Sequence, residues 1–417
     1  MRAEFGLFFF LKKNFGNGLY YKETIMKKDI SILFSVLWLL SSCASADKFS
    51  LDTSNPLALL VQIAWSVNSV PSTSNTIHFV AVGEKCSSWT SKDGKTWTYS
   101  NSKFSGCTDG SVNSIAFGNG TWVAVGALNA NGGCGIWSSK DADTWTAASC
   151  APNPSPPNGT SALHNLNTIV YAGTNFIAGG PHNYSTTGVG FFGQISSNGS
   201  TWQYLSLTDG STYIGSDYLY SSSYNSVSSE IYFSGIHNVN PEVVKLTVPS
   251  LTQTSVSVNM PSSSYGVLAL KSGKILLYGD DNYTNPTVGM VKIGTPITSL
   301  GSTASANTGV GSHINVAVEG KDKIVILGNQ CKMDYYSLTA QVWHVGAAPD
   351  MVGCSRLDWM SLSYNSTLDL FVAGAKVAGT VPTAFAYSTT GLPSDWTLVT
   401  QTDAGSPGPG ILGIATQ

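Results

Sequence analysis

The sequence predicts an all-β fold, a seven-bladed β-propeller of four-stranded antiparallel blades, on three observations. The chain has 43 Gly, 17 Pro and only 11% charged residues, which is typical of short strands and tight turns and unlike charged amphipathic helices. A unit of four short apolar runs recurs along the chain, and repeats of this length are typical of propellers. A spare apolar run, residues 410–416, ends the chain and is available to close a ring.

The clearest copy of the unit predicts four strands, at residues 112–117, 122–126, 135–139 and 144–146. The first two are separated by Gly118-Asn119-Gly120, which is a hairpin turn signal. The second run recurs seven times and ends in glycine each time, at residues 79–83, 122–126, 176–179, 231–235, 275–279, 324–328 and 370–374. The final glycines lie roughly 43 to 56 residues apart, a propeller-blade period, so we assign the propeller to residues 71–417.

The first copy has no apolar run before its second strand, whereas residues 410–416 have no strands after them. We therefore expect the C-terminal run to supply the innermost strand of the first blade. This pairing would close the ring and remove the sheet edges that invite aggregation.

Three copies end in a short polar turn followed by tryptophan. The residues are Ser91, Asp93, Gly94 and Trp97; Ser139, Asp141 and Trp145; and Ser197, Asn198, Gly199 and Trp202. These turns resemble the Asp-box, or BNR repeat, of sialidase-like propellers, and residues 388–396 are a looser relative. The resemblance implies a turn between the third and fourth strands, with the Asp or Asn bonded to nearby backbone and the Trp packed between blades.

Six cysteines lie within the repeats, and an even number in an exported chain suits disulfides. Cys86, Cys134 and Cys331 follow second strands, while Cys107, Cys150 and Cys354 follow fourth strands. Neighbouring antiparallel strands bring those ends together, so we expect the bridges 86–107, 134–150 and 331–354. No CxxC pair or histidine cluster favours the alternative of a metal site, and no cofactor is expected.

The N-terminus predicts export and a lipid anchor. Residues 26–42 have a lysine-containing start and an apolar stretch too short to span a bilayer, which is typical of a signal peptide. Leu40-Ser41-Ser42-Cys43 resembles a bacterial lipobox, which implies acylation of Cys43 and attachment to a membrane of the cell envelope. Ala44 stands where an aspartate would favour the inner membrane, so we expect the outer membrane.

The segments flanking this signal have their own interpretations. Residues 1–25 precede a complete signal peptide, so we expect translation to start at Met26; an unusually long N-terminal region is the alternative. Residues 43–70 are predicted to form a tether and a short apolar segment.

Charge and arginine content exclude some functions. Loss of residues 1–42 removes six basic and three acidic residues and leaves a formal charge of −6, which disfavours nucleic acid as a partner. Sialidases clamp a substrate carboxylate with three arginines, but the mature chain has only Arg356, so the resemblance to sialidases does not extend to activity.

We therefore predict a monomeric, non-catalytic envelope protein that binds or scaffolds a protein or glycan partner. Residues 181–192 and 210–219 are the longest insertions and are rich in Tyr, Ser, Gly and Asn, which suits either adaptable contacts or solvated low-complexity loops. The alternative is a polysaccharide hydrolase or lyase with a pair of carboxylates on the axis. No spacing in the sequence singles out such a pair.

Overall fold

The protein is described by a computed structural model. The description covers residues 76–101, 103–129, 132–152, 165–180, 191–207, 218–237, 240–257, 264–280, 289–294, 306–308, 314–329, 331–345, 354, 357–377, 382–402, 404–405 and 408–417. All of them lie in the compact unit Asn75–Gln417. The predictions for residues 1–25, 26–42 and 43–70, including Cys43, lie outside the described residues. Within the described ranges, no helix is long and apolar enough to span a membrane.

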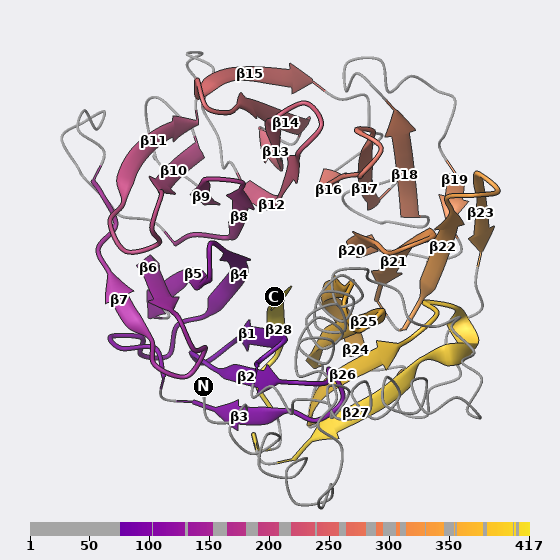
Figure 1. Ribbon diagram of the computed structural model, residues 1–417, viewed down its shortest axis with the longest axis horizontal. Helices are drawn as coiled ribbons and strands as arrows, with labels where there is room; N and C mark the ends of the chain where they lie inside the picture. Colours follow the sequence, from indigo (N-terminus) through magenta and orange to yellow (C-terminus); the bar gives the residue numbers. More distant parts are fainter. Residues whose placement is uncertain are drawn as a thin grey trace, which may run out of the picture. The chain divides into compact units, whose positions relative to one another are not determined.

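The described strands form seven four-stranded antiparallel sheets, which confirms the predicted seven-bladed propeller (Figure 1). From the inner to the outer strand, blades 1 to 4 contain β28 (Ile411–Thr416), β1 (Phe79–Gly83), β2 (Ser88–Ser91) and β3 (Thr98–Ser100); β4 (Val112–Gly118), β5 (Thr121–Asn129), β6 (Gly132–Ser139) and β7 (Thr146–Ala148); β8 (Thr168–Ala172), β9 (Asn175–Gly180), β10 (Phe191–Ser196) and β11 (Gln203–Leu207); and β12 (Tyr218–Asn225), β13 (Glu230–His237), β14 (Asn240–Thr247) and β15 (Thr252–Ser257).

Blades 5 to 7 have the same order. They contain β16 (Ser264–Ala269), β17 (Ile275–Asp280), β18 (Gly289–Gly294) and β19 (Ala306–Thr308); β20 (Ile314–Glu319), β21 (Lys323–Gly328), β22 (Met333–Ser337) and β23 (Val342–Val345); and β24 (Leu357–Asn365), β25 (Leu370–Val377), β26 (Thr383–Ser388) and β27 (Thr397–Gln401). A single-turn helix, η4 (Pro393–Asp395), precedes β27. All seven predicted second strands are present, but the outer strand of blade 2 begins at Thr146, because residues 144 and 145 belong to the preceding turn.

The chain closes the ring as predicted. β28 pairs antiparallel with β1, with Phe79 opposite Thr416 and Ala81 opposite Ile414. Each inner strand also contacts the inner strand of the next blade, from β28 through β4, β8, β12, β16, β20 and β24 back to β28. Closure of the ring therefore turns the inner edge of every sheet toward the axis and leaves the outer strands as the edges at the rim.

Glycine at the end of the second strand has a steric cause. A Cβ atom on Gly83 would lie 2.0 Å from the carbonyl oxygen of Gly410, and one on Gly126 would lie 2.0 Å from that of Ser111. In both blades the chain entering the inner strand crosses directly over the glycine. In blade 3 the residue in this position is Gly180, because the carbonyl oxygen of Asn165 lies 2.1 Å from its Cβ position, and not the Gly179 used to align the repeats.

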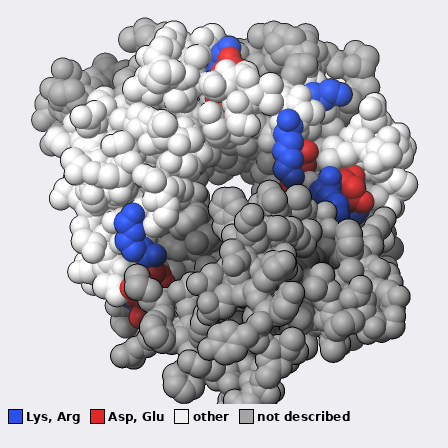
Figure 2. Space-filling view, viewed as in Figure 1, with Lys and Arg blue, Asp and Glu red and all other residues white. Residues whose placement is uncertain are grey.

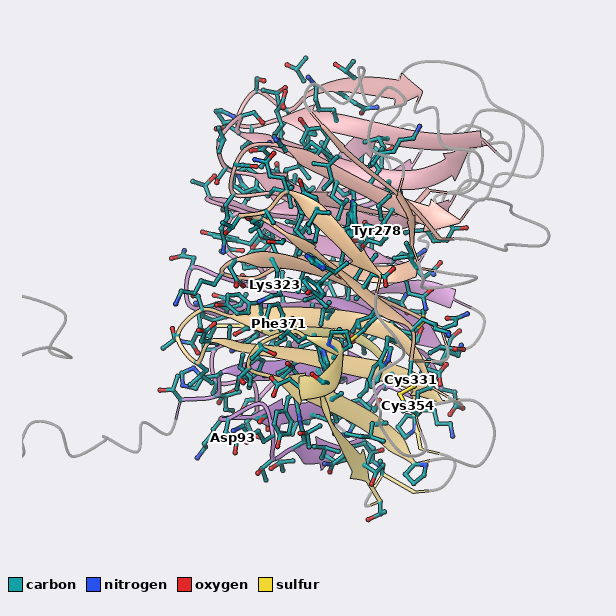
Figure 3. The ribbon with its side chains drawn as sticks, turned by 90° about the vertical axis from the view of Figure 1, so that its right-hand side faces the viewer. Asp93, Tyr278, Lys323, Cys331, Cys354 and Phe371 are labelled. Carbon is teal, nitrogen blue, oxygen red and sulfur yellow. A yellow bond between two sulfur atoms is a disulfide. The ribbon has the colours of Figure 1, made fainter. Side chains whose placement is uncertain are left out.

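The meander order places different connections on the two faces of the ring. The turns from the first to the second strand and from the third to the fourth strand lie on one face, here called the turn face. The turns from the second to the third strand and the connections between blades lie on the other, here called the loop face. Figure 3 shows Asp93, in a turn from third to fourth strand, and the Cys331–Cys354 disulfide on opposite sides of the disc.

All three predicted disulfides are present, linking Cys86 to Cys107, Cys134 to Cys150 and Cys331 to Cys354. Each joins a second-to-third-strand connection, or the strand beginning there, to the segment that leaves the outer strand of the same blade. All three therefore lie on the loop face. In the chain-entropy model, a disulfide that closes a loop of about 15 to 25 residues stabilises the folded protein by roughly 3 kcal/mol. These bridges therefore restrict the loops of that face.

Candidate functional site

The polar turns predicted from the sequence form one repeated hydrogen-bonded structure on the turn face. In blade 1, Ser91 Oγ accepts a bond from the Gly94 amide at 2.9 Å, and Asp93 Oδ1 accepts bonds from the amides of Lys95 and Thr96 at 2.8 and 2.7 Å. In blade 2, Asp141 Oδ1 binds the amides of Asp143 and Thr144 in the same way. We call these the serine turns.

The structure corrects the serine of the third turn. Ser196, and not the predicted Ser197, accepts the bond from the Gly199 amide at 2.8 Å and donates to Asn198 Oδ1 at 3.1 Å. The turn therefore has the same length as the other two, and Asn198 takes the place of the aspartate.

Blade 7 contains a variant of the serine turn. Ser388 Oγ accepts a bond from the Gly391 amide at 2.8 Å, as in the other turns. The carboxylate comes instead from Asp395, further along the chain, whose Oδ2 accepts bonds from the amides of Thr389 and Thr390 at 3.1 and 2.9 Å.

The serine turns pack against the preceding blade. A Cβ atom on Gly94 would lie 2.6 Å from Leu370 of blade 7, and one on Gly199 would lie 2.7 Å from Val123 of blade 2. Trp97, after the first turn, stacks on Phe385 of blade 7 at 3.9 Å between ring centroids. These residues therefore join blades, and the serine, aspartate and asparagine side chains form their hydrogen bonds within the turns.

The acidic groups of the serine turns are hydrogen-bond acceptors rather than acids. Bonds from the amides of Thr144 and Asp143 lower the pKa of Asp141 to about 2. Burial would raise the pKa of Asp93 and of Asp395, but the bonds that each carboxylate accepts lower it below its ordinary value. A general acid needs the opposite shift.

The strongest candidate site is a set of β-bulges at the loop-face end of the inner strands. Six blades show a register shift at the same level of the inner strand. The extra residues are Leu412 in blade 1, Asn113 in blade 2, Tyr220 in blade 4, Tyr265 in blade 5, Asn315 in blade 6 and Met360 in blade 7. Bulges often occur beside functional sites, where they redirect a side chain.

Asn167 is the equivalent residue of blade 3. Its Nδ2 donates to the carbonyl of Leu219, the residue before the bulge in blade 4, at 3.1 Å. Asn113 Nδ2 likewise donates to the carbonyl of Leu166, the residue before Asn167, at 2.8 Å. We call the seven residues together the bulge ring.

The bulge residues are more accessible than the residues that precede them. Val112, Leu219 and Ile314, each directly before a bulge residue, are 0% exposed, and Trp359 before Met360 is 1% exposed. The bulge residues whose side chains are described are all half-buried. Figure 2 shows an opening at the centre of the ring, so the inner strands surround an axial channel.

Glu84 and Lys376, two charged residues at the loop-face ends of their strands, form an ion pair with each other. Glu84, at the end of β1, accepts a bond from the Gly410 amide at 3.1 Å and pairs with Lys376 of β25 at 3.1 Å. Asp358 of β24 lies opposite Lys376 in the strand register. Figure 2 views the opposite side of the ring, the turn face, where charged residues form small separate groups and no band of basic residues is present among the described residues.

Of the two long insertions predicted to form binding loops, only the ends are described. Phe191 and Phe192 begin β10, and Tyr218 and Leu219 begin β12. The strand ends on either side of both insertions lie on the loop face, the same face as the bulge ring. The sequence did not indicate the bulge ring, because its residues share no side-chain type.

Comparisons with known proteins show the fold alone. No family model and no curated protein matches the chain. Among solved structures, YCF48 bound to a D1 peptide is 13% identical, with a TM-score of 0.50 over 73% of this chain and 86% of that one. The computationally designed Ika8 protein is 10% identical, with a TM-score of 0.45 over 78% of this chain and 88% of that one.

Proposed function

We propose that this protein is a non-catalytic, lipid-anchored protein of the bacterial cell envelope whose propeller binds a protein or glycan partner on its loop face. The observation that carries this proposal is the concentration of three disulfides and the bulge ring at that face. Loops fixed on a rigid scaffold are where binding residues usually lie. The turn face, by contrast, uses its polar turns to join blades.

Further observations support the separate parts of the proposal. YCF48, which has the same fold, was solved with a peptide bound. The serine turns support the interpretation that they are Asp-boxes of a sialidase-like propeller without sialidase chemistry, and we infer a monomer because the ring closes on itself. The signal at residues 26–42 supports attachment through Cys43, with outer-membrane placement favoured by Ala44.

Site-specific cross-linking tests where the partner binds. A photoreactive residue replaces Lys85, which is exposed on the loop face, and in a second protein Val227, which is 66% exposed on the turn face. We expect cross-linking to one partner from position 85 and none from position 227 when both full-length proteins are expressed in a bacterium. Cross-linking only from position 227 would contradict the proposal.

Fatty-acid labelling tests the anchor. The wild-type chain should incorporate labelled palmitate and remain with the membranes, whereas Cys43→Ala should do neither. Equal labelling of the two proteins would contradict the lipid anchor.

A hydrolysis assay on polysaccharides tests the enzymatic alternative. Turnover by the purified protein that Glu84→Gln abolishes would contradict the non-catalytic function and favour a hydrolase or lyase.

A further inference from the structure

Two Asn-Gly pairs lie within the described residues, and their surroundings are opposite in character. Asn119-Gly120 forms the turn between β4 and β5 of blade 2, and Asn198-Gly199 lies in the serine turn of blade 3. An Asn-Gly pair is able to cyclise, because glycine has no side chain to hinder the approach of its own backbone nitrogen to the asparagine Cγ atom. Whether the reaction occurs depends on how firmly the nitrogen and the side-chain amide are held.

Both reactive groups of Asn198-Gly199 are bonded within the serine turn. The Gly199 amide would have to lose its proton and attack, but it donates that proton to Ser196 Oγ at 2.8 Å in a buried hydrogen bond. Asn198 Oδ1 accepts bonds from the amides of Ser200 and Thr201, both at 2.9 Å, and these bonds oppose rotation of the side chain. Cyclisation at this pair therefore requires several hydrogen bonds to break together.

Asn119-Gly120 has none of these restraints. Both residues are exposed, in a two-residue turn where Gly118 lies opposite Thr121. The Asn119 side chain and the Gly120 amide are bonded to no other described residue, and no atom lies within 4 Å of the Cβ position of Gly120. The nitrogen reaches Cγ by rotation within these two residues alone, and the open space around Gly120 permits that rotation.

We propose that Asn119 is a site of spontaneous deamidation and that Ser196 protects Asn198 from the same reaction. Hydroxide removes the proton of the Gly120 amide, the nitrogen forms a bond to Asn119 Cγ, and the side-chain nitrogen takes a proton from water and leaves as ammonia. Water then opens the cyclic imide. Attack at the side-chain carbonyl gives aspartate and attack at the main-chain carbonyl gives isoaspartate, so asparagine and water become either acid and ammonia.

The modification changes the turn face and not the loop face. Either product places a negative charge at the inner turn of blade 2, and isoaspartate also adds a methylene group to the backbone of that turn. The inference is therefore independent of the partner proposed for the loop face.

Ageing of the purified full-length protein in mildly alkaline water enriched in heavy oxygen tests the proposal. Peptide mapping by mass spectrometry should show conversion of Asn119 to aspartate and isoaspartate that carry the heavy oxygen. Conversion of Asn198 should be at least about tenfold slower, since the loss of several hydrogen bonds must precede it. In denaturant the two sites should convert at similar rates, because both are Asn-Gly pairs.

Ser196→Ala tests the protection. It removes the acceptor of the Gly199 amide, so conversion of Asn198 should accelerate by about fivefold or more. Ser197→Ala changes the neighbouring, exposed serine and is the matched control, which should leave the rate unchanged. Thermal unfolding identifies the variants that fold. If Ser196→Ala does not fold, Ser196→Thr decides the question, because it keeps the hydroxyl and should keep Asn198 protected.

Three outcomes would overturn the proposal. The first is equal conversion of the two asparagines in the folded protein. The second is an intact Asn119 after a period in which the denatured chain converts completely. The third is conversion of Asn198 that stays slow in folded Ser196→Ala or becomes fast in folded Ser196→Thr.

Discussion

Two of the interfaces between neighbouring blades, here called seams, are stabilised by different interactions. One lies between blades 7 and 1 and the other between blades 4 and 5. The first contains a cluster of large buried side chains that includes Phe79, Trp89, Trp97 and Phe385. At the second, the described apolar cluster contains one aromatic residue, Tyr232. There, Ser221 and Ser223 of blade 4 instead accept bonds from the amides of Val267 and Ala269 of blade 5, both at 2.9 Å.

The difference indicates an uneven distribution of stability around the ring. Each buried aromatic side chain removes about 150–250 Å² from water, whereas a typical hydrogen bond contributes only about 1 kcal/mol net. The aromatic seam borders blade 1, where the first and last strands of the propeller meet, β1 and β28. The seam beside the point of closure is therefore expected to be the more stable, and the seam between blades 4 and 5 the first to open.

The largest effect is expected for Trp97→Ala. Trp97 is 5% exposed and stacks on Phe385, so its removal leaves a cavity in the aromatic seam and should lower the free energy of unfolding by about 3–5 kcal/mol. Denaturant unfolding measures the loss. Trp343→Ala, at a half-buried position in an outer strand, is the control and should cost less than half as much. Equal losses would contradict the special role of this seam.

A smaller loss is expected for Gly94→Ala. The new Cβ atom would lie 2.6 Å from Leu370 in a residue with a φ of +70°, so packing strain adds to backbone strain and the loss should be about 3 kcal/mol. Gly106→Ala isolates the backbone strain, because Gly106 has a φ of +77° and no atom within 4 Å of its Cβ position. That variant should lose only about 1–2 kcal/mol, and a similar loss in both would show that the turn does not press against blade 7.

Ser221→Ala and Ser223→Ala address the hydrogen-bonded seam. Each removes the acceptor of a partly buried amide, so each should lower the free energy of unfolding by about 1–2 kcal/mol. Ser250→Ala, in an exposed turn of blade 4, is the matched control. Denaturant unfolding should show no loss of stability for the control. If either serine variant lost more stability than Trp97→Ala, the seam between blades 4 and 5 would be the more strongly held of the two.

The smallest effect is a pH dependence at the seam between blades 1 and 2. The pKa of Asp141 is lowered to about 2, so the contribution of its carboxylate is complete above its ordinary pKa of 3.8 and is lost as the pH falls through about 2. Asp141→Asn should remove this part of the acid dependence, since Asn198 makes the equivalent bonds in blade 3. Unfolding midpoints between about pH 4 and pH 2 measure it. Identical acid profiles for the two proteins would contradict the assignment.

The sequence was sufficient for the fold because each blade repeats local signals. The second strands could be aligned from their apolar runs, and once they were aligned the cysteines had one arrangement that paired neighbouring strand ends. The tail strand followed from the missing inner strand of the first copy. These inferences needed only periodicity and the antiparallel order of a meander.

The site was less accessible to sequence reasoning. A bulge is set by backbone pairing, so residues as different as Asn113, Met360 and Leu412 occupy one structural position without a common signal. Glu84 and Lys376 pair only because the ring brings blades 1 and 7 together. Two adjacent serines precede Asn198; the two-residue spacing from serine to aspartate in the first two turns matches Ser196, and the hydrogen bonds show that Ser196 takes that role.

Amide hydrogen exchange of the folded protein compares the hydrogen-bonded seam between blades 4 and 5 with β28, the closing strand of blade 1 beside the aromatic seam. Local opening of the weaker seam exposes the amides of Val267 and Ala269, whereas the amides of β28 bonded to β1 need a larger unfolding event. We predict faster exchange at Val267 and Ala269 than in β28. If the β28 amides exchange at the same rate as those two amides, or faster, the seam between blades 4 and 5 is not the less stable one, and the account is contradicted.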